Sequence, residues 1–234
     1  MKDVQIHQLQ NGSAVEIERK KSGRGHRYIL NGEGKGVKSM TSILDHLDVG
    51  SFGIGMNWAL KQARIAGNDL DAPKRIGEEA RKGGELLHAQ IEDYINTGSI
   101  AESLPFLSWH ELISTWQFQG LDLIATERFV FDPELMIGGT VDAIAQVDGE
   151  ILILDWKTKA SDSYYKYGPS IKDKVQLAGY THALRNMNSI FAPSKAALVY
   201  VMRDGGKAVR VDVDLEKYIP IYKATHQLHS LLED

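Results

Sequence analysis

The pattern of hydrophobic and polar positions changes near residue 120. Before that point, apolar residues recur at the spacing of amphipathic helices, with Leu87, Ile91 and Tyr94 on one face of the longest. The predicted helices there span residues 56–67, 73–97 and about 106–119. After that point, short segments rich in Val, Ile, Leu and Phe are typical of strands. These strands span residues 125–131, 138–147, 150–157 and 197–202.

The remaining C-terminal segments complete an α/β pattern. A helix is predicted over 170–187, between the third and fourth strands, and a further strand over 207–213 follows the Asp204-Gly205-Gly206 turn. The chain ends in an amphipathic helix. Helices followed by strands with one crossover helix predict an α/β fold, in which a mixed central sheet is flanked by helices.

The N-terminal third predicts smaller elements. Residues 13–30 alternate enough to indicate strands around the basic turn Lys20-Lys21-Ser22-Gly23-Arg24, and a mobile glycine-rich linker, Asn31 to Gly36, follows. A Ser or Thr should then cap a short helix within Ser39–Leu44. We expect one domain over 1–234, with an N-terminal hairpin and helical lobe over 1–120 and a catalytic α/β core over 121–234.

Composition narrows the classes of protein. Hydrophobic residues make up 43% and charged residues 25%, as in ordinary globular domains, and the net charge of −4 argues against nucleic-acid binding by bulk charge alone. The chain has no cysteine, which excludes disulfides, thiolate zinc sites and an iron–sulfur cluster. No apolar run approaches the roughly 18 residues of a membrane span, and the N-terminus lacks signal-peptide features. We therefore expect a cytoplasmic protein without membrane contacts, in the host cytoplasm if a phage encodes it.

The most informative segment is the hairpin formed by residues 138–157. Asp148-Gly149 is a strong signal for a two-residue type I′ turn, because both positions need a positive φ. With that turn, Val147 faces Glu150 and Asp142 faces Asp155, in the closer class of cross-strand pair. The two carboxylates should then lie on one face with Cβ atoms roughly 4.5–5.5 Å apart. A bound divalent cation would remove their repulsion.

Lys157 extends the same pattern. It lies two residues after Asp155 and so projects from the same face, while apolar residues occupy both faces of the strand before it. A strand that is apolar on both faces is covered on both sides, which disfavours a simple surface ion pair. Carboxylates suit Mg²⁺ or Mn²⁺, and a nearby ammonium can orient a hydroxide or offset charge on a phosphate.

Four ordered motifs resemble the PD-(D/E)xK nuclease superfamily, in the branch typified by the RecB nuclease domain. The motifs are Gly84-x-x-x-His88 with Ile91-Glu92-x-Tyr94, Gly139-Thr140-Val141-Asp142, Asp155-Trp156-Lys157-Thr158, and Gln176-x-x-x-Tyr180. Each is weak alone, but their order over residues 84–180 is specific. The segment Ser39–Leu44 also looks like the start of phage and mitochondrial genome maintenance exonucleases of this branch.

The resemblance implies roles for individual residues. Asp142 and Asp155 would bind the metal with the main-chain carbonyl of Trp156, and His88 would complete the metal shell. Lys157 would position the attacking water. Two further residues, Gln176 and Tyr180, would border the site and the DNA backbone. Glu127, on the preceding strand, is an additional candidate ligand.

These observations predict a Mg²⁺- or Mn²⁺-dependent deoxyribonuclease that acts on DNA, and the branch favours an exonuclease of phage or recombination type. A recombination or single-strand-binding protein could act with it in trans. Three alternatives stay open: a structure-specific or single-strand endonuclease, a non-catalytic DNA-binding recombination accessory protein, and a metal hydrolase of another phosphoester. The second is disfavoured because Asp142, Asp155 and Lys157 are all intact.

Overall fold

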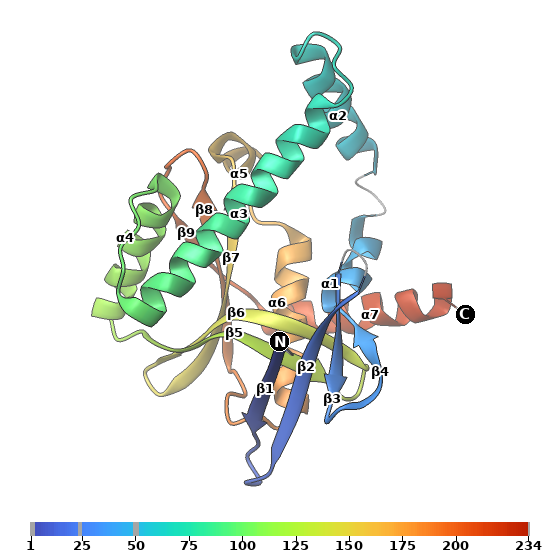
Figure 1. Ribbon diagram of the computed structural model, residues 1–234, viewed down its shortest axis with the longest axis vertical. Coiled ribbons are helices and arrows are strands. Elements are labelled where there is room, and N and C mark those ends of the chain that lie inside the picture. Colours follow the sequence, from blue (N-terminus) through green and yellow to red (C-terminus); the bar gives the residue numbers. More distant parts are fainter. Residues whose placement is uncertain (1–2, 23–24, 49–51, 234) are drawn as a thin grey trace.

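A computed structural model describes residues 3–22, 25–48 and 52–233 (Figure 1). Its strands are β1 (Asp3–Gln8), β2 (Ala14–Ser22), β3 (Gly25–Leu30), β4 (Glu33–Lys38), β5 (Asp122–Asp132), β6 (Ile137–Val147), β7 (Glu150–Lys159), β8 (Lys195–Met202) and β9 (Val209–Asp212). Its helices are α1 (Met40–Ile43), the 3₁₀ helix η1 (Leu44–Asp48), α2 (Phe52–Ile65), α3 (Ala72–Thr97), α4 (Leu104–Phe118), α5 (Ser161–Tyr167), α6 (Ile171–Asn186) and α7 (Leu215–Glu233).

The larger sheet has the order β5-β6-β7-β8-β9. Its strands pair antiparallel except for β7 and β8, which are parallel. A parallel pair needs a crossover connection, and α6 provides it between these two strands. The structure therefore confirms the predicted mixed sheet and its crossover helix. The same connection also contains the short helix α5, which the sequence analysis did not predict.

Each face of this sheet is covered by helices. On one face, Ile144 and Ile153 belong to a cluster with buried residues of α1, α6 and α7. On the other, Leu154 and Trp156 belong to a cluster with buried residues of α3 and α4. Alternate residues of β7 therefore enter different cores, as the apolar pattern predicted. Since α3 and α4 share a core with the sheet, the N-terminal helices are joined to the C-terminal half of the chain by packing.

Strands β1 to β4 form a second sheet, in the order β1-β2-β3-β4, in which neighbouring strands are antiparallel. It packs against β5 and β6 through Ile17, Tyr28 and Phe129. The sequence predicted only the central hairpin of this sheet. The expected mobile linker is wrong, because Glu33–Lys38 pairs with β3 through an irregular register. Positive φ angles at Gly34 and Gly36 allow that irregularity.

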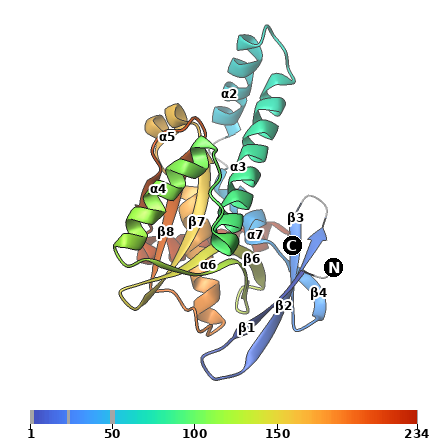
Figure 2. The same ribbon diagram turned by 60° about the vertical axis from the view of Figure 1, so that its left-hand side comes forward.

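The long helix α3 crosses the main sheet and continues beyond it, where it pairs with α2 in a projecting hairpin (Figures 1 and 2). The short helix α1 begins after Ser39 as expected, but the Ser39 hydroxyl contacts the Thr41 hydroxyl and caps no backbone N–H. Gly23 and Arg24 of the expected basic turn lie outside the described residues. No helix in the described part of the chain is long and apolar enough to span a bilayer. The single-domain division of the chain stays a prediction.

Candidate metal centre and active site

The β6–β7 hairpin has the register predicted from its turn. Asp148 and Gly149 have φ angles of 51° and 80°, and Val147 pairs with Glu150. The regular pairs end at Ala143 and Leu154, one pair before the two aspartates. Beyond that point the Oδ2 atom of Asp142 accepts a hydrogen bond of 2.7 Å from the Trp156 N–H. The Asp142 carboxylate therefore takes over a backbone N–H of β7 where the ladder ends.

Three side chains from separate elements converge beside this hairpin. His88 of α3, Glu127 of β5 and Asp142 of β6 each bring a ligand atom, and these atoms lie within 4.8 Å of one another. The His88 Nδ1 atom is 4.0 Å from Glu127 Oε1 and 3.8 Å from Asp142 Oδ1. One imidazole and two carboxylates form a donor set that fits Mn²⁺ or Mg²⁺.

The Trp156 carbonyl lies behind His88. Its oxygen is 3.2 Å from the His88 Nε2 atom, so an Nε2–H donates to it and turns Nδ1 toward the two carboxylates. A second hydrogen bond of this kind is common for metal-binding histidines, because it fixes the ring and its tautomer. The sequence predicted this carbonyl as a metal ligand, and the geometry gives it a contact with the His88 ring.

Glu127 reaches the site through an irregularity in β5. It lies between Thr126 and Arg128, which pair regularly with β6, but its own φ is 47°. The side chain of Gln5 bridges this irregularity. Its Nε2 donates to the Glu127 carbonyl at 2.7 Å and its Oε1 accepts from the Phe129 N–H at 2.8 Å. The side-chain amide of Gln5 therefore makes the two backbone hydrogen bonds that a neighbouring strand would otherwise make with β5 at this point.

Asp155 and Lys157 form a separate pair. The Lys157 ammonium makes an ion pair with Asp155 Oδ2, and the Asp155 side chain is only 3% exposed. Asp155 was expected to bind the metal with Asp142. In the described part of the chain, it does not belong to the group of ligand atoms within 4.8 Å. The structure therefore places Asp155 against the lysine and places Glu127, with His88 and Asp142, in the group of atoms that could hold a metal ion.

The electrostatics of the site fit a cation. Burial and the neighbouring charge of Asp155 raise the pKa of Asp142 to about 7. Burial also raises the pKa of Asp155, against the opposing effect of Lys157. Burial alone would lower the pKa of His88, but Glu127, Asp142 and Asp155 outweigh it and raise this pKa to about 9. A raised pKa shows that the negative charge of a buried carboxylate is poorly balanced by its surroundings. A bound divalent cation would balance the charge of both carboxylates.

Gln176 and Tyr180 of α6 contact each other, since Gln176 Nε2 donates to the Tyr180 hydroxyl at 2.7 Å. Tyr180 is only 3% exposed, so its ring packs inside the protein beside the site. The ring lies directly over Gly139, where a Cβ atom would come within 2.3 Å of it. Similarly, a Cβ at Gly84 would lie 3.3 Å from the Thr158 hydroxyl. Two glycines of the motifs are therefore contact points for residues of other motifs.

A second cluster of possible ligands joins Asp132, Glu134 and His182. The sequence analysis did not identify it. The Asp132 carboxylate accepts from the backbone N–H groups of Glu134 and Leu135, contacts His182 Nδ1 at 2.7 Å and accepts from Asn186 at 3.1 Å. A carboxylate with so many partners fixes the β5–β6 turn against α6.

Comparisons with known proteins agree with the geometry. Residues 99–233 match the sequence model of the PD-(D/E)XK nuclease superfamily. Among solved structures, one titled "Crystal structure of SSO0001" is 19% identical, with 84% of this chain and 78% of that chain covered and a TM-score of 0.39. An alkaline exonuclease (LHK-Exo) from Laribacter hongkongensis is 13% identical, with 64% and 82% covered and a TM-score of 0.32. At these TM-scores neither likeness carries an inference. Curated protein sequences give no significant match.

Proposed function

Because the chain belongs to the PD-(D/E)XK nuclease superfamily, we propose that it is a Mg²⁺- or Mn²⁺-dependent exonuclease that hydrolyses phosphodiester bonds of DNA. The observation that carries this proposal is the convergence of His88, Glu127 and Asp142 beside the Asp155–Lys157 pair. Nucleases of the superfamily use divalent metals, and this donor set supplies ligands of the required chemistry.

In this proposal His88 Nδ1 and the carboxylates of Glu127 and Asp142 hold the cation. A divalent cation there would lower the pKa of a bound water and stabilise charge on the phosphate. Asp142 also accepts the Trp156 N–H, which fixes its carboxylate relative to β7. The Trp156 carbonyl orients the His88 ring by accepting a hydrogen bond from it.

Lys157 is the proposed positioning group for the attacking water. Its pKa is raised because the carboxylates of Asp155, Asp142 and Asp173 outweigh the effect of burial, so it remains an ammonium. The Lys157 side chain is 23% exposed, and its ion pair with Asp155 fixes the position of the ammonium. A charged, directed ammonium can orient a water for in-line attack and offset the charge that develops on the phosphate.

Gln176 and Tyr180 support the site from α6 in this proposal. Burial raises the pKa of Tyr180 well above its usual value, so its hydroxyl keeps its proton. Gln176 is half-buried and lies at the border that a DNA backbone would approach. Its amide would orient the Tyr180 hydroxyl and contact the backbone.

The proposed preference for DNA ends rests on the α2–α3 hairpin, which extends beyond the sheet from the helix that carries His88 (Figure 1). Lys61, Arg64 and Lys74 are exposed on it and could attract a strand. Arg75 lies on the same hairpin, but its guanidinium is paired with Asp69 at 2.5 Å. A recombination or single-strand-binding protein could deliver such a strand in trans.

The test compares linear and covalently closed circular DNA, each single- and double-stranded, with Mg²⁺, Mn²⁺ or EDTA. We expect degradation of linear DNA to short products with metal, survival of the circles, and no cleavage in EDTA. Asp142→Asn, Asp155→Asn and Lys157→Met should each abolish cleavage while the protein stays folded. Rapid loss of the circles would instead identify an endonuclease. Normal cleavage by Asp142→Asn would remove the proposed active site.

A further inference from the structure

The short helix α5 lies beyond the end of β7, the strand that carries Lys157 (Figure 1). One residue, Ala160, separates Lys159 at the end of β7 from the start of α5. Lys159 projects from the same face of β7 as Lys157, because it lies two positions further along the strand. At about 3.3 Å per residue, the two Cα atoms are about 7 Å apart. The strand therefore leads directly from the proposed water-positioning lysine to α5.

Tyr200 of β8 holds α5 on the face of the sheet that carries Lys157. It pairs with Lys157 across the parallel strands β7 and β8, so both side chains lie on one face. Tyr164 of α5 packs on the Tyr200 ring, with the two ring centres 5.1 Å apart. The Lys159 ammonium lies 5.0 Å from the centre of the same ring and donates to the Gly168 carbonyl at 3.3 Å. The C-terminal end of α5 is therefore held beside Lys159.

Tyr167, the last residue of α5, carries an exposed aromatic ring at that end of the helix. The residue is 66% exposed, and the Lys166 ammonium lies 5.0 Å from the centre of its ring. Tyr165 is similarly exposed, but the two lysines contact Tyr167 and its neighbour Gly168. Bases of single strands stack on aromatic side chains, and cations beside them bind the backbone. The C-terminal end of α5 combines both features.

The acidic side chains around α5 already have hydrogen-bond donors. Asp162 lies in the first turn of the helix, where its carboxylate accepts a backbone N–H at 2.7 Å. Asp204 accepts both the N–H and the hydroxyl of Ser161, at the N-terminal end. A third acid, Asp173 of α6, accepts the Tyr200 hydroxyl at 2.7 Å. Two of the three acids therefore lie at the end of α5 that is opposite Tyr167.

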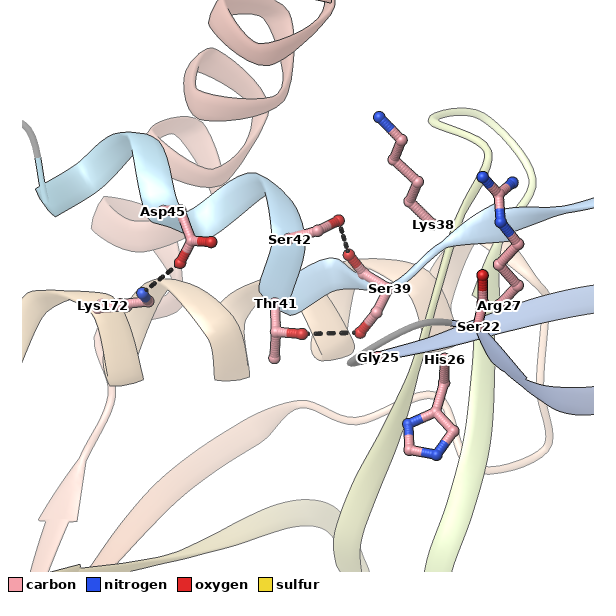
Figure 3. Close-up of a pocket in the computed structure, with 10 residues that line it drawn as sticks. All are labelled: Ser22, Gly25, His26, Arg27, Lys38, Ser39, Thr41, Ser42, Asp45 and Lys172. Carbon is pink, nitrogen blue, oxygen red and sulfur yellow. Dashed lines mark hydrogen bonds and ion pairs between the residues drawn. The ribbon is translucent and has the colours of Figure 1, made fainter. Parts of the chain in front are cut away.

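The cations lie at the C-terminal end of α5. Neither Lys159 nor Lys166 makes an ion pair within the residues that the structure describes. The next lysine along the chain, Lys172, is bound to Asp45 at 2.8 Å beside α1 and is not counted with them (Figure 3). Two cations and an exposed ring therefore lie together next to Lys157, and their charge is complementary to a phosphate backbone.

We propose that Tyr167 is a platform on which a base of a single DNA strand stacks, while Lys159 and Lys166 bind the neighbouring phosphates. The inference rests on the proposed nuclease function and adds the path that the strand takes from Lys157 to α5. A paired base is stacked inside the duplex, so a strand must be unpaired to use the platform. The platform therefore favours single-stranded over double-stranded substrates.

The test measures binding of fluorescently labelled oligothymidylate by anisotropy in EDTA over a range of salt. A strand of equal length with abasic sites in place of the bases has the same backbone charge and nothing to stack. Tyr167→Ala and Tyr167→Gln remove the ring, and Tyr167→Phe keeps it. Phe118→Ala is the matched control, because it removes a 95% exposed ring from the C-terminal end of α4. Thermal melting checks that each variant is folded.

We expect Tyr167→Ala and Tyr167→Gln to bind oligothymidylate about 10-fold more weakly, as for loss of one stacked base. Tyr167→Phe should bind like the wild type, and the abasic strand should bind the wild type and Tyr167→Ala equally. The salt slope should not change in Tyr167→Ala, whereas Lys166→Gln should reduce it by about 0.7. Unchanged affinity without the ring, an equal loss on the abasic strand, or an equal loss in Phe118→Ala would overturn the proposal.

Hydrolysis with Mn²⁺ gives a second measurement. The KM for the oligonucleotide should rise in Tyr167→Ala with little change in kcat, because the stacked base is bound equally in the ground and transition states. A fall in kcat with an unchanged KM would contradict the platform. Absence of hydrolysis by the wild type would instead contradict the nuclease function, while binding in EDTA would still test the platform.

Discussion

Replacement of Asp142 by Asn should stabilise the metal-free protein. The Asp142 side chain is only 12% exposed, and burial together with the charge of Asp155 raises its pKa from 3.8 to about 7. A carboxyl whose folded pKa is raised costs stability when it ionises, so the cost grows above pH 4 and is complete above pH 7. A shift of about 3 pKa units corresponds to about 4 kcal/mol.

That value already includes the attraction between the Asp142 carboxylate and His88, which lowers the pKa of Asp142. The amide oxygen of Asn can still accept the Trp156 N–H, so this hydrogen bond can persist in the variant. For a protein of this size, each kcal/mol shifts the Tm by about 2–4 °C. Asp142→Asn should therefore raise the Tm by several degrees at pH 8 in EDTA, and the gain should shrink as the pH falls toward 4.

Thermal melting followed by circular dichroism tests this expectation at pH 4, 6 and 8, in EDTA and with saturating Mn²⁺. A ligand that binds only the folded state stabilises the wild type, and the variant should gain little from it. The difference in Tm should therefore close or reverse with Mn²⁺. Glu111→Gln, on the exposed surface of α4, is the control for removal of one negative charge. No gain for Asp142→Asn in EDTA, or the same gain with and without Mn²⁺, would refute the reasoning.

Three further predictions follow from individual contacts. His88→Ala should weaken Mn²⁺ binding at least about 10-fold by calorimetry, with activity partly restored at high Mn²⁺, whereas unchanged affinity would make His88 structural. Gly139→Ala should cost about 1–3 kcal/mol in denaturant unfolding, because its Cβ meets the Tyr180 ring, whereas Gly77→Ala in α3 should stabilise slightly. His7 is fully buried, and burial followed by the charge of Arg128 lowers its pKa to about 4. The wild type should therefore lose up to about 3 kcal/mol relative to His7→Leu between pH 6.5 and 4, and parallel pH profiles would contradict this.

Much of the catalytic half could be predicted from local signals. The Asp148-Gly149 turn needs positive φ at both residues, so two residues determined the register of a whole hairpin. The apolar residues on both faces of β7 predicted a strand covered on both sides, and both cores are present. Local rules were sufficient here because turn chemistry and side-chain alternation act within a few residues.

The N-terminal sheet was harder to predict because its edges depend on partners. Strand β4 contains Gly34 and Gly36, whose positive φ angles are typical of turns in an isolated sequence. Pairing with β3, and packing of Tyr28 against Gly138, stabilise it as a strand. A glycine-rich segment can therefore form either a linker or an irregular edge strand, and contacts distant in sequence determine which.

The same limit explains why the donor set was only partly predicted. Hairpin register brings Asp142 toward Asp155, but the ladder ends before that pair, and the Lys157 ammonium engages Asp155. The pairs on either side place Glu127 opposite Asp142 of β6, and its backbone there adopts a φ of 47°, which glutamate does not favour by itself. The amide of Gln5, 122 residues earlier in the chain, binds the Glu127 carbonyl and the Phe129 N–H. The strain at Glu127 is therefore offset by the N-terminal sheet, so the position of one candidate metal ligand depends on a strand that is far in sequence from every nuclease motif.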